Sequence, residues 1–404
     1  MLVIIAWRNI WRNKVRSLVV MMSIAVGLWA GLSAMSFSFG MYQGHIQNVI
    51  LYQLSHIQVH HPGFRSEMEL NDTVRYSQEL QNTINSMSEV KATVRRCISP
   101  SMIVTASGSS GIMLVGTQIS DERKVTGLDS MVIDGTYFTD STRKEIVIGS
   151  KLAEKIHAKI GSKVVVMLQD ANNEMVSGAY RVKGIYKTRN SAYDESMVFL
   201  PLQRMQELAA LGNVSNELAV LLNEGASLEQ TRTQISSLAK GEEVMDWMGL
   251  SPELDLVVNS FDLYMYIFMG IILMALMFGI VNTMLMAVLE RQRELGMLMA
   301  IGMNRIRIFA MVMLETIWVA LVGGPLGLLL GHMTIRYFGA HGVNLSQYSE
   351  ALSMYGFSNV IYFQLDQKYY WPVLLMTIGV AVVSAVYPAI KAVRLEPTQA
   401  IRKI

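Results

Sequence analysis

Four long runs of apolar residues dominate the pattern of the chain, and Glu315 is the only charged residue within them. A helix needs about 20 apolar residues to cross the hydrocarbon core of a bilayer. The pattern therefore predicts transmembrane helices at residues 18–41, 263–289, 309–333 and 371–387. The fourth run is the shortest, and Pro372 and Pro388 bracket it, so its ends are the least defined.

The segment between the first two runs, residues 42–262, has the patterning of a soluble domain. Two stretches with helical spacing are each followed by a strand-like stretch: SQELQNTINSM precedes EVKATVRRC, and SLEQTRTQISSL precedes EEVMDWM. Five more strand-like stretches lie between these pairs: GIMLVGTQI, EIVIGSKL, KVVVMLQD, YRVKGIYK and SMVFLPL. The predicted fold class is a membrane α-helical protein with four transmembrane helices plus an α/β extracytoplasmic domain. That domain carries an inserted β-rich subdomain at about residues 111–212.

Lysine and arginine near the spans predict the orientation, because short basic segments stay in the cytoplasm. The three basic segments are residues 1–17 with Arg8, Arg12, Lys14 and Arg16, residues 290–308 with Arg291, Arg293, Arg305 and Arg307, and residues 388–404 with Lys391, Arg394, Arg402 and Lys403. With four spans, all three are cytoplasmic only if residues 42–262 and the loop 334–370 lie outside the cytoplasm. We expect the first span to remain uncleaved, since its apolar run is longer than the roughly 7–15 residues of a signal-peptide core.

The first 17 residues have the pattern of an interfacial helix. Arg8, Arg12 and Arg16 recur every four residues on one helical face, and Trp7 and Trp11 fall on the opposite side. Two interpretations remain open: a membrane anchor that also sets topology, and a helix that lies against a cytoplasmic partner protein.

The sequence offers no recognisable catalytic or nucleotide-binding motif. No G-x-x-x-x-G-K-[ST], GxSxG, HExxH or CxxC pattern occurs in the 404 residues. Cys97 is the single cysteine, so no disulfide can form within the chain. We interpret the alternating stretch HIQVHHP as a strand at the edge of a sheet rather than a metal site. We therefore expect no catalytic residue, cofactor or metal on this chain, and no nucleic-acid partner.

The stretch LERQRELGMLMAIGMNRIRIF joins the second and third spans. No helix breaker precedes Gly296, so the second span is expected to continue past the membrane surface, and Gly302 and Asn304 allow a turn after a short second helix. One interpretation is a basic loop that only sets topology. The other is a helix on the cytoplasmic face that binds a soluble partner.

This stretch resembles the cytoplasmic loop of the FtsX-like permease family, of the MacB and LolC/LolE type. The family pattern N-x-M-x-x-x-V-x-E-R-x-x-E-I-G-x-L-x-A-x-G is matched here by Asn282, Met284, Val288, Glu290, Arg291, Glu294, Leu295, Gly296, Leu298, Ala300 and Gly302, with leucine in place of the usual isoleucine. The N-terminal WRNIWRNKVRSLVVMMSIAVG, the third-span LETIWVALVGGPLGLLLG and the C-terminal YPAIKAVRLEPTQAIR, with Pro388, Pro397, Ala400 and Arg402, are also similar to the family. EIVIGSKLAEKIHAKIGSKVVV resembles part of a MacB-like periplasmic core domain.

The resemblance implies a bacterial inner-membrane ABC transporter permease that acts by mechanotransmission. It implies a dimer of two permeases, identical or different, with two cytoplasmic ATPase subunits that hold the ATP and Mg²⁺. The residues it assigns to ATPase coupling are Glu290, Arg291, Arg293, Glu294, Gly296, Met297, Leu298, Ala300, Gly302 and Arg305. We expect extraction of lipoproteins from the outer leaflet. The alternatives are export of peptides or antibiotics from the periplasm and FtsX-like signalling to a cell-wall hydrolase.

Small and polar residues within the spans suggest helix contacts. Ser23, Gly27 and Gly31 repeat every four residues in the first span, a spacing that allows helices to approach closely, and we expect this face at the dimer contact. A carboxylate in hydrocarbon is costly, so Glu315 needs a partner, with Asn282 or an arginine of the loop as the candidates.

Overall fold

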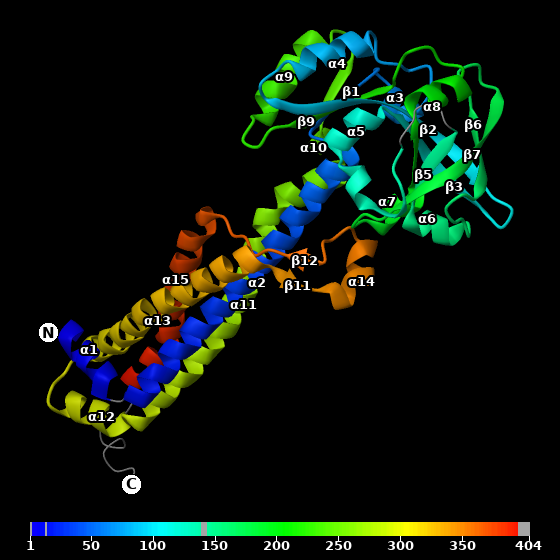
Figure 1. Ribbon diagram of the computed structural model, residues 1–404. Helices are drawn as coiled ribbons and strands as arrows, with labels where there is room; N and C mark the ends of the chain where they lie inside the picture. The colour runs from blue at the N-terminus through cyan, green and yellow to red at the C-terminus, as the bar shows by residue number, and fades with distance from the viewer. Residues whose placement is uncertain (1, 13, 139–143, 395–404) are drawn as a thin grey trace. The chain divides into compact units, whose positions relative to one another are not determined.

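The computed structural model describes residues 2–12, 14–138 and 144–394, and it divides into two compact units (Figure 1). A helical unit comprises Met1–Tyr42, Val258–Asn344 and Val360–Ile404. A mixed unit comprises Gln43–Val257 and Leu345–Asn359. The two units are described separately below.

The helical unit is built from four long helices and two short ones. The long helices are α2 (Lys14–Val49), α11 (Pro252–Glu290), α13 (Arg305–His341) and α15 (Tyr370–Val393), and the short ones are α1 (Leu2–Arg12) and α12 (Gln292–Ala300). Within the described residues, four helical segments have the length and apolar composition needed to cross a membrane. Each of the long helices extends beyond the apolar run that predicts its span, because backbone hydrogen bonding does not require apolar side chains. Pro372 lies in the first turn of α15, where the missing N–H costs little, and the helix continues through Pro388.

Glycines bring the long helices into close contact. Gly323, Gly327 and Gly331 of α13 face α2, and a Cβ atom added to Gly327 would lie 2.7 Å from the carbonyl oxygen of Ala25. Gly27 faces α11, where an added Cβ would lie 2.6 Å from Cδ1 of Leu276. The face predicted to contact a second permease therefore packs, at Gly27 and Gly31, against α11 of the same chain, and Ser23 lies exposed. Its role in a dimer stays a prediction.

Hydrogen bonds also link α11 to the segment that precedes α15. Asp262 of α11 accepts hydrogen bonds from Lys368 Nζ at 3.0 Å and from the Tyr369 hydroxyl, in the short helix η4 (Gln367–Tyr369). A two-stranded sheet of β11 (Val343–Asn344) and β12 (Val360–Ile361) joins the segments that follow α13 and precede α15.

The mixed unit contains a ten-stranded sheet in the order β10-β1-β9-β2-β3-β8-β5-β7-β4, with β6 pairing to both β2 and β7. The strands are β1 (Ile57–His60), β2 (Val90–Val104), β3 (Ser109–Thr117), β4 (Val132–Gly135), β5 (Glu145–Gly149), β6 (Lys163–Gln169), β7 (Met175–Tyr186), β8 (Met197–Pro201), β9 (Glu217–Leu222) and β10 (Glu243–Asp246). The pairings close β2, β3, β8, β5, β7 and β6 into a ring around one apolar core. The strands of the predicted insert thus form a barrel, which is completed by β2 from outside the insert.

A second core lies where helices cover the remaining strands. The helices α4 (Ser77–Asn85) and α9 (Leu228–Leu238) contribute Ile84 and Ile235 to a cluster with β1 and β9. The shorter helices of this unit are α3 (Phe64–Glu67), α5 (Ile119–Val125), α6 (Ser150–Lys155), α7 (Ser191–Ser196), α8 (Leu202–Leu208), α10 (Trp247–Leu250) and α14 (Ser349–Met354). The 15-residue strand β2 takes part in both cores and links the helix-covered part to the barrel.

Two details differ from the sequence expectations. HIQVHHP does form a strand, β1, but β1 lies between β10 and β9 and is fully buried, so the prediction of an edge strand was wrong. The predicted soluble domain comprised residues 42–262, yet residues 345–359 of the predicted loop 334–370 also belong to the mixed unit. There Ser191 donates to Ser353 at 3.0 Å, and His45 hydrogen-bonds to the carbonyl oxygen of Gly356 at 3.1 Å.

Candidate functional site

The predicted coupling segment folds as a helix between two turns. Helix α11 ends at Glu290, Arg291 leaves helical geometry with φ −98° and ψ 17°, and α12 follows. Gly302 then turns the chain with φ +99°, a conformation that disfavours side chains other than glycine. Asn304 begins α13 by accepting a hydrogen bond from the backbone N–H of Ile306 at 3.2 Å.

Behind α12, three helical segments are tied together by one polar cluster. Arg291 Nη1 lies 3.2 Å from both carboxylate oxygens of Glu315 on α13. Arg291 Nη2 also donates to the carbonyl oxygen of Asn9 on α1 at 3.0 Å, and the Asn9 amide donates to Glu315 Oε1 at 2.7 Å. The side chains of Arg291 and Glu315 are 10% and 13% exposed, so a charge left alone here would be poorly solvated. We call Asn9, Arg291 and Glu315 the α12 clasp.

The clasp identifies the residue that pairs with Glu315, the charged residue of the third span. The partner of Glu315 is an arginine of the loop, whereas Asn282 lies exposed on α11. Sequence reasoning missed Asn9, one of two asparagines in the N-terminal segment and the one that directly precedes the apolar Ile10. It also missed the ion pair between Arg12 and Glu294, since nothing in the spacing connects residues so far apart.

Helix α1 also makes apolar contacts within the protein. The Trp7 ring packs edge-on against Trp318 of α13 with 5.1 Å between ring centroids, and Ile10 is buried in the same cluster as Leu295 and Ile308. The arginine-rich N-terminal segment is therefore attached to the coupling segment as well as patterned for a membrane surface.

The segment from α12 to the start of α13 presents apolar side chains to solvent. Met297 is 53% exposed, Ile301 81% and Ile306 73%, and they lie on either side of the Gly302 turn. We call these three residues the apolar tip. Of the predicted coupling residues, Arg291 and Gly296 are buried, Leu298 is half-buried, and Glu290, Arg293, Glu294, Met297, Ala300, Gly302 and Arg305 are exposed. A soluble partner can reach this surface, which combines apolar side chains with basic ones.

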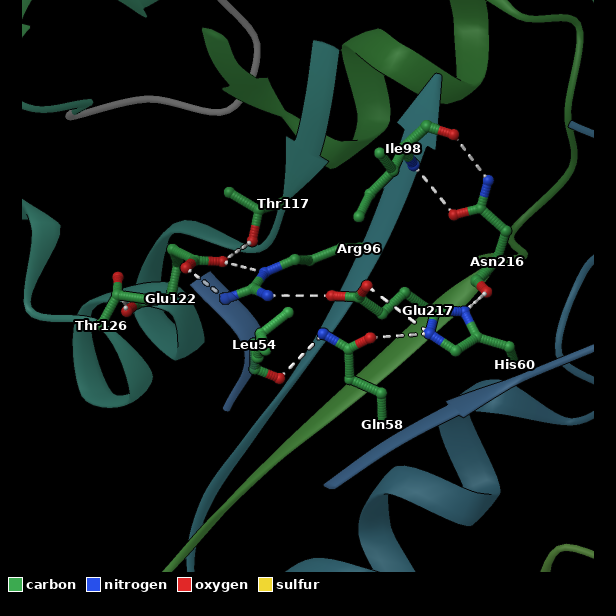
Figure 2. A network of polar contacts seen from close by, with 10 residues as sticks. All are labelled: Leu54, Gln58, His60, Arg96, Ile98, Thr117, Glu122, Thr126, Asn216 and Glu217. Carbon is green, nitrogen blue, oxygen red and sulfur yellow. Dashed lines mark hydrogen bonds and ion pairs between the residues drawn. The ribbon is translucent and has the colours of Figure 1, made fainter. Parts of the chain in front are cut away.

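A second polar cluster lies inside the mixed unit (Figure 2). Arg96 of β2 donates to Glu122 of α5 at 2.7 and 2.9 Å and to Glu217 of β9 at 2.8 Å. Register explains the geometry, because Arg96 pairs directly with Glu217 and with Thr117 on its two neighbouring strands. Glu217 also lies 3.7 Å from His60 Nε2.

The electrostatics of this cluster indicate a structural role. Burial alone lowers the pKa of Arg96, but the charge and hydrogen bonds of Glu122 outweigh it and raise that pKa. Burial favours neutral Glu122, yet Arg96 holds the pKa of that carboxyl below its usual range. Burial lowers the pKa of His60, against an opposing effect of Glu217. The cluster is satisfied by its own members, and no metal-binding group of His, Cys, Asp and Glu occurs in the described part of the chain.

Comparison with known proteins covers both units. Residues 17–238 match the MacB-like periplasmic core domain, which is more than half of the chain, and residues 266–397 match the FtsX-like permease C-terminal region. The chain belongs to the FtsX-like permeases with a MacB-like periplasmic core domain. The FtsX-like match contains α12 together with Arg291 and Glu315, and the MacB-like match contains Arg96 and its partners.

Individual relatives give the family a transport context. An uncharacterized ABC transporter permease of Methanocaldococcus jannaschii is 25% identical over 71% of this chain and 69% of its own length. The lipoprotein-releasing system transmembrane protein LolC of Neisseria meningitidis is 22% identical over 97% of this chain and 95% of its own length. The macrolide export ATP-binding/permease protein MacB of Escherichia coli is 25% identical over 58% of this chain, but this match covers only 37% of MacB. The crystal structure of the periplasmic region of MacB from Actinobacillus actinomycetemcomitans matches 54% of this chain at 14% identity with a TM-score of 0.37.

These findings make the protein an ABC transporter permease of the MacB/LolC/FtsX type, a membrane protein with a MacB-like periplasmic domain. The orientation of its termini stays a prediction. Pro397, Ala400, Arg402 and Lys403 of the predicted cytoplasmic tail lie outside the described residues.

Proposed function

We propose that this permease couples ATP hydrolysis by a separate cytoplasmic ATPase to movement of its MacB-like domain, and that α12 is the segment that binds the ATPase. The observation that carries the proposal is the contrast between the two ends of α12. The apolar tip is exposed toward its C-terminal end and the Gly302 turn, while Arg291, the residue that precedes its N-terminal end, is fixed to α13 and α1 by the α12 clasp. A surface that binds a partner and cannot move without its neighbours is suited to transmit force.

The energetics of the clasp explain why the three segments should move together. Removing one partner of a buried ion pair costs about 3–5 kcal/mol, because the other charge stays behind without compensation. A displacement of α12 that left Glu315 behind would meet this cost and would also break the hydrogen bond to the Asn9 carbonyl. A push on α12 is therefore passed to α13 and α1 rather than absorbed in the loop.

Two long helices continue from one unit into the other, which suits them to transmit movement along the chain. Both α2 and α11 contribute residues to the helical unit and to the mixed unit. ATP and Mg²⁺ belong to the partner in this proposal, and two permeases, identical or different, would pair with two ATPase subunits.

For the substrate we propose a lipoprotein or similar amphiphile extracted from the outer leaflet of the inner membrane. The support is the match to LolC, a protein of a lipoprotein-releasing system, over nearly the whole length of both chains. The match to MacB, named for macrolide export, covers much less of that relative. Export of peptides or antibiotics and signalling to a cell-wall hydrolase are the alternatives that the experiment must separate.

The test is purification of the full-length protein from its native membrane in mild detergent, followed by mass spectrometry of the proteins that accompany it. We expect a P-loop ATPase together with acylated lipoproteins. If an ATPase copurifies with an outer-membrane channel or adaptor, the function is export rather than lipoprotein extraction. If an ATPase copurifies with a peptidoglycan hydrolase, the function is signalling. Absence of any ATPase, even with trapped nucleotide, would contradict the role of α12.

A further inference from the structure

A polar pocket in the MacB-like domain has no role in the coupling proposed above. Its volume is about 760 Å³, within the roughly 300–1,000 Å³ typical of sites for small ligands. Its polar lining includes Arg95 of β2, Gln118 and Arg123 at α5, Gln203 and Gln206 of α8, and Asn213. Two guanidinium groups and several side-chain amides thus line one cavity.

Arg95 is buried but lacks the charged partners that its neighbour has. Successive residues of a strand point to opposite faces, so Arg95 and Arg96 face different surroundings. Arg96 contacts two carboxylates, whereas no carboxylate of the described residues lies within ion-pair distance of Arg95. Arg95 is only 2% exposed, and its Nε atom is buried without a hydrogen-bond partner.

The contacts that Arg95 does make are to neutral groups. Its Nη1 donates to Asn213 Oδ1 at a long 3.5 Å. With the Gln118 amide oxygen facing it, Arg95 Nη2 donates to that oxygen at 2.9 Å, while the Gln118 nitrogen donates to Asp121 Oδ2 at 2.8 Å. Asp121 is itself held by Gln81 at 3.0 Å. The guanidinium thus uses two of its five N–H groups in these contacts, and its buried Nε–H has no partner.

Burial of a charge without a direct counterion is unfavourable, and it lowers the pKa of Arg95 despite the nearby charge of Asp121. A ligand that brought an oxyanion to the remaining N–H groups of this guanidinium would reduce this penalty, because a planar guanidinium binds carboxylate or phosphate oxygens in pairs. The amides of Gln203 and Asn213 could then hydrogen-bond to the rest of the ligand.

We propose that this pocket binds a small polar ligand through an oxyanion, either a carboxylate or a phosphate, with Arg95 as the anchoring residue. The lining residue Arg123, which is ion-paired to Asp129 at 2.9 Å, brings a second guanidinium group to the pocket. The site is independent of α12, so its failure would leave the proposed coupling intact.

The test uses the full-length protein in detergent and isothermal titration calorimetry with four probes: tri-alanine, tri-alanine amide, glycerol 3-phosphate and inorganic phosphate. We expect tri-alanine or one of the phosphates to bind, which identifies the source of the oxyanion, and tri-alanine amide to bind at least about tenfold more weakly than tri-alanine. The variant Arg95→Gln should lose at least about tenfold in affinity. The control Arg232→Gln, on the surface of α9, should bind as the wild type does. Equal binding by Arg95→Gln and the wild type, or no binding of any probe to the wild type, would overturn the proposal.

A stability measurement separates a ligand anchor from a structural arginine. Thermal unfolding of Arg95→Gln without ligand should occur at the wild-type temperature or above it, since the change removes a buried and incompletely paired charge. Arg96→Gln should unfold at a lower temperature, because it strands Glu122 and Glu217. An equal loss in the two variants would make Arg95 a structural residue and refute the site.

Discussion

The α12 clasp gives the sharpest prediction, a double-mutant cycle on Arg291 and Glu315. The two side chains are 10% and 13% exposed, and the Arg291 guanidinium reaches both carboxylate oxygens at 3.2 Å. Replacing Glu315 by Leu leaves a buried guanidinium without its counterion, and replacing Arg291 by Met leaves a buried carboxylate. Each change should cost about 3 kcal/mol, the lower end of the range for buried pairs, because both groups keep some contact with solvent. That cost changes the ratio of folded to unfolded protein by a factor on the order of 10².

The double variant Arg291→Met/Glu315→Leu removes both charges and should recover most of this loss, since apolar replacement of a buried pair is often close to neutral. The assay is equilibrium unfolding of the purified protein in detergent, together with stimulation of the ATPase by the permease. We expect a coupling energy of at least about 2 kcal/mol between the two sites. If the two single losses simply add in the double variant, the two side chains do not interact and the clasp is wrong.

Three further predictions concern other parts of the molecule. Burial raises the pKa of Cys97 to about 12, so the thiol should resist maleimide labelling at pH 8 in the folded protein and react only after unfolding; rapid labelling of the native state would contradict the buried position. Gly302→Ala forces a side chain into a backbone with φ +99° at a cost of about 1–2 kcal/mol, which should weaken ATPase stimulation, while Gly279→Ala, where an added Cβ meets nothing within 4 Å, should not. Burial lowers the pKa of His60 from its usual 6.5. As the pH falls below 6.5, His60 is therefore protonated in the unfolded chain before it is protonated in the folded one, and the stability of the MacB-like domain should decrease with decreasing pH. His60→Gln should show a flatter pH dependence of unfolding temperature between pH 6.5 and 5, and an unchanged slope would refute the assignment of that loss to His60.

Local pattern was sufficient for the longer helices and most strands, whereas the short helices of the mixed unit, such as α5 and α8, were not predicted. Long apolar runs located the membrane helices, because the side chains of these helices face lipid or one another. Alternation of apolar and polar residues located β2, β3 and β6, because successive side chains of a strand point to opposite faces of the sheet. The turn at Gly302 was also predictable, since few residues other than glycine accept a positive φ.

The missed features depend on contacts between distant segments. An arginine of the loop was a predicted candidate for the partner of Glu315, but the sequence did not distinguish Arg291 from the other loop arginines. The third member of the clasp, Asn9, is recognised only when α1 and α13 are brought together. Likewise β1 lies inside the sheet because β10, almost 200 residues later in the chain, pairs with it. Closure of the barrel by β6 on β2 is also a long-range pairing that alternation cannot reveal.

Site-specific photo-crosslinking tests the central claim, that α12 binds the ATPase, most directly. A photoreactive residue is placed at Ile301, which is 81% exposed in the apolar tip, and a control is placed at Ile133, which is 61% exposed in the MacB-like domain. We expect irradiation of native membranes to join the ATPase to the Ile301 position, more strongly with trapped nucleotide, and to leave the Ile133 position without an ATPase product. A product at Ile133 and none at Ile301 would contradict the claim and would reduce the segment after α11 to a loop that only sets topology.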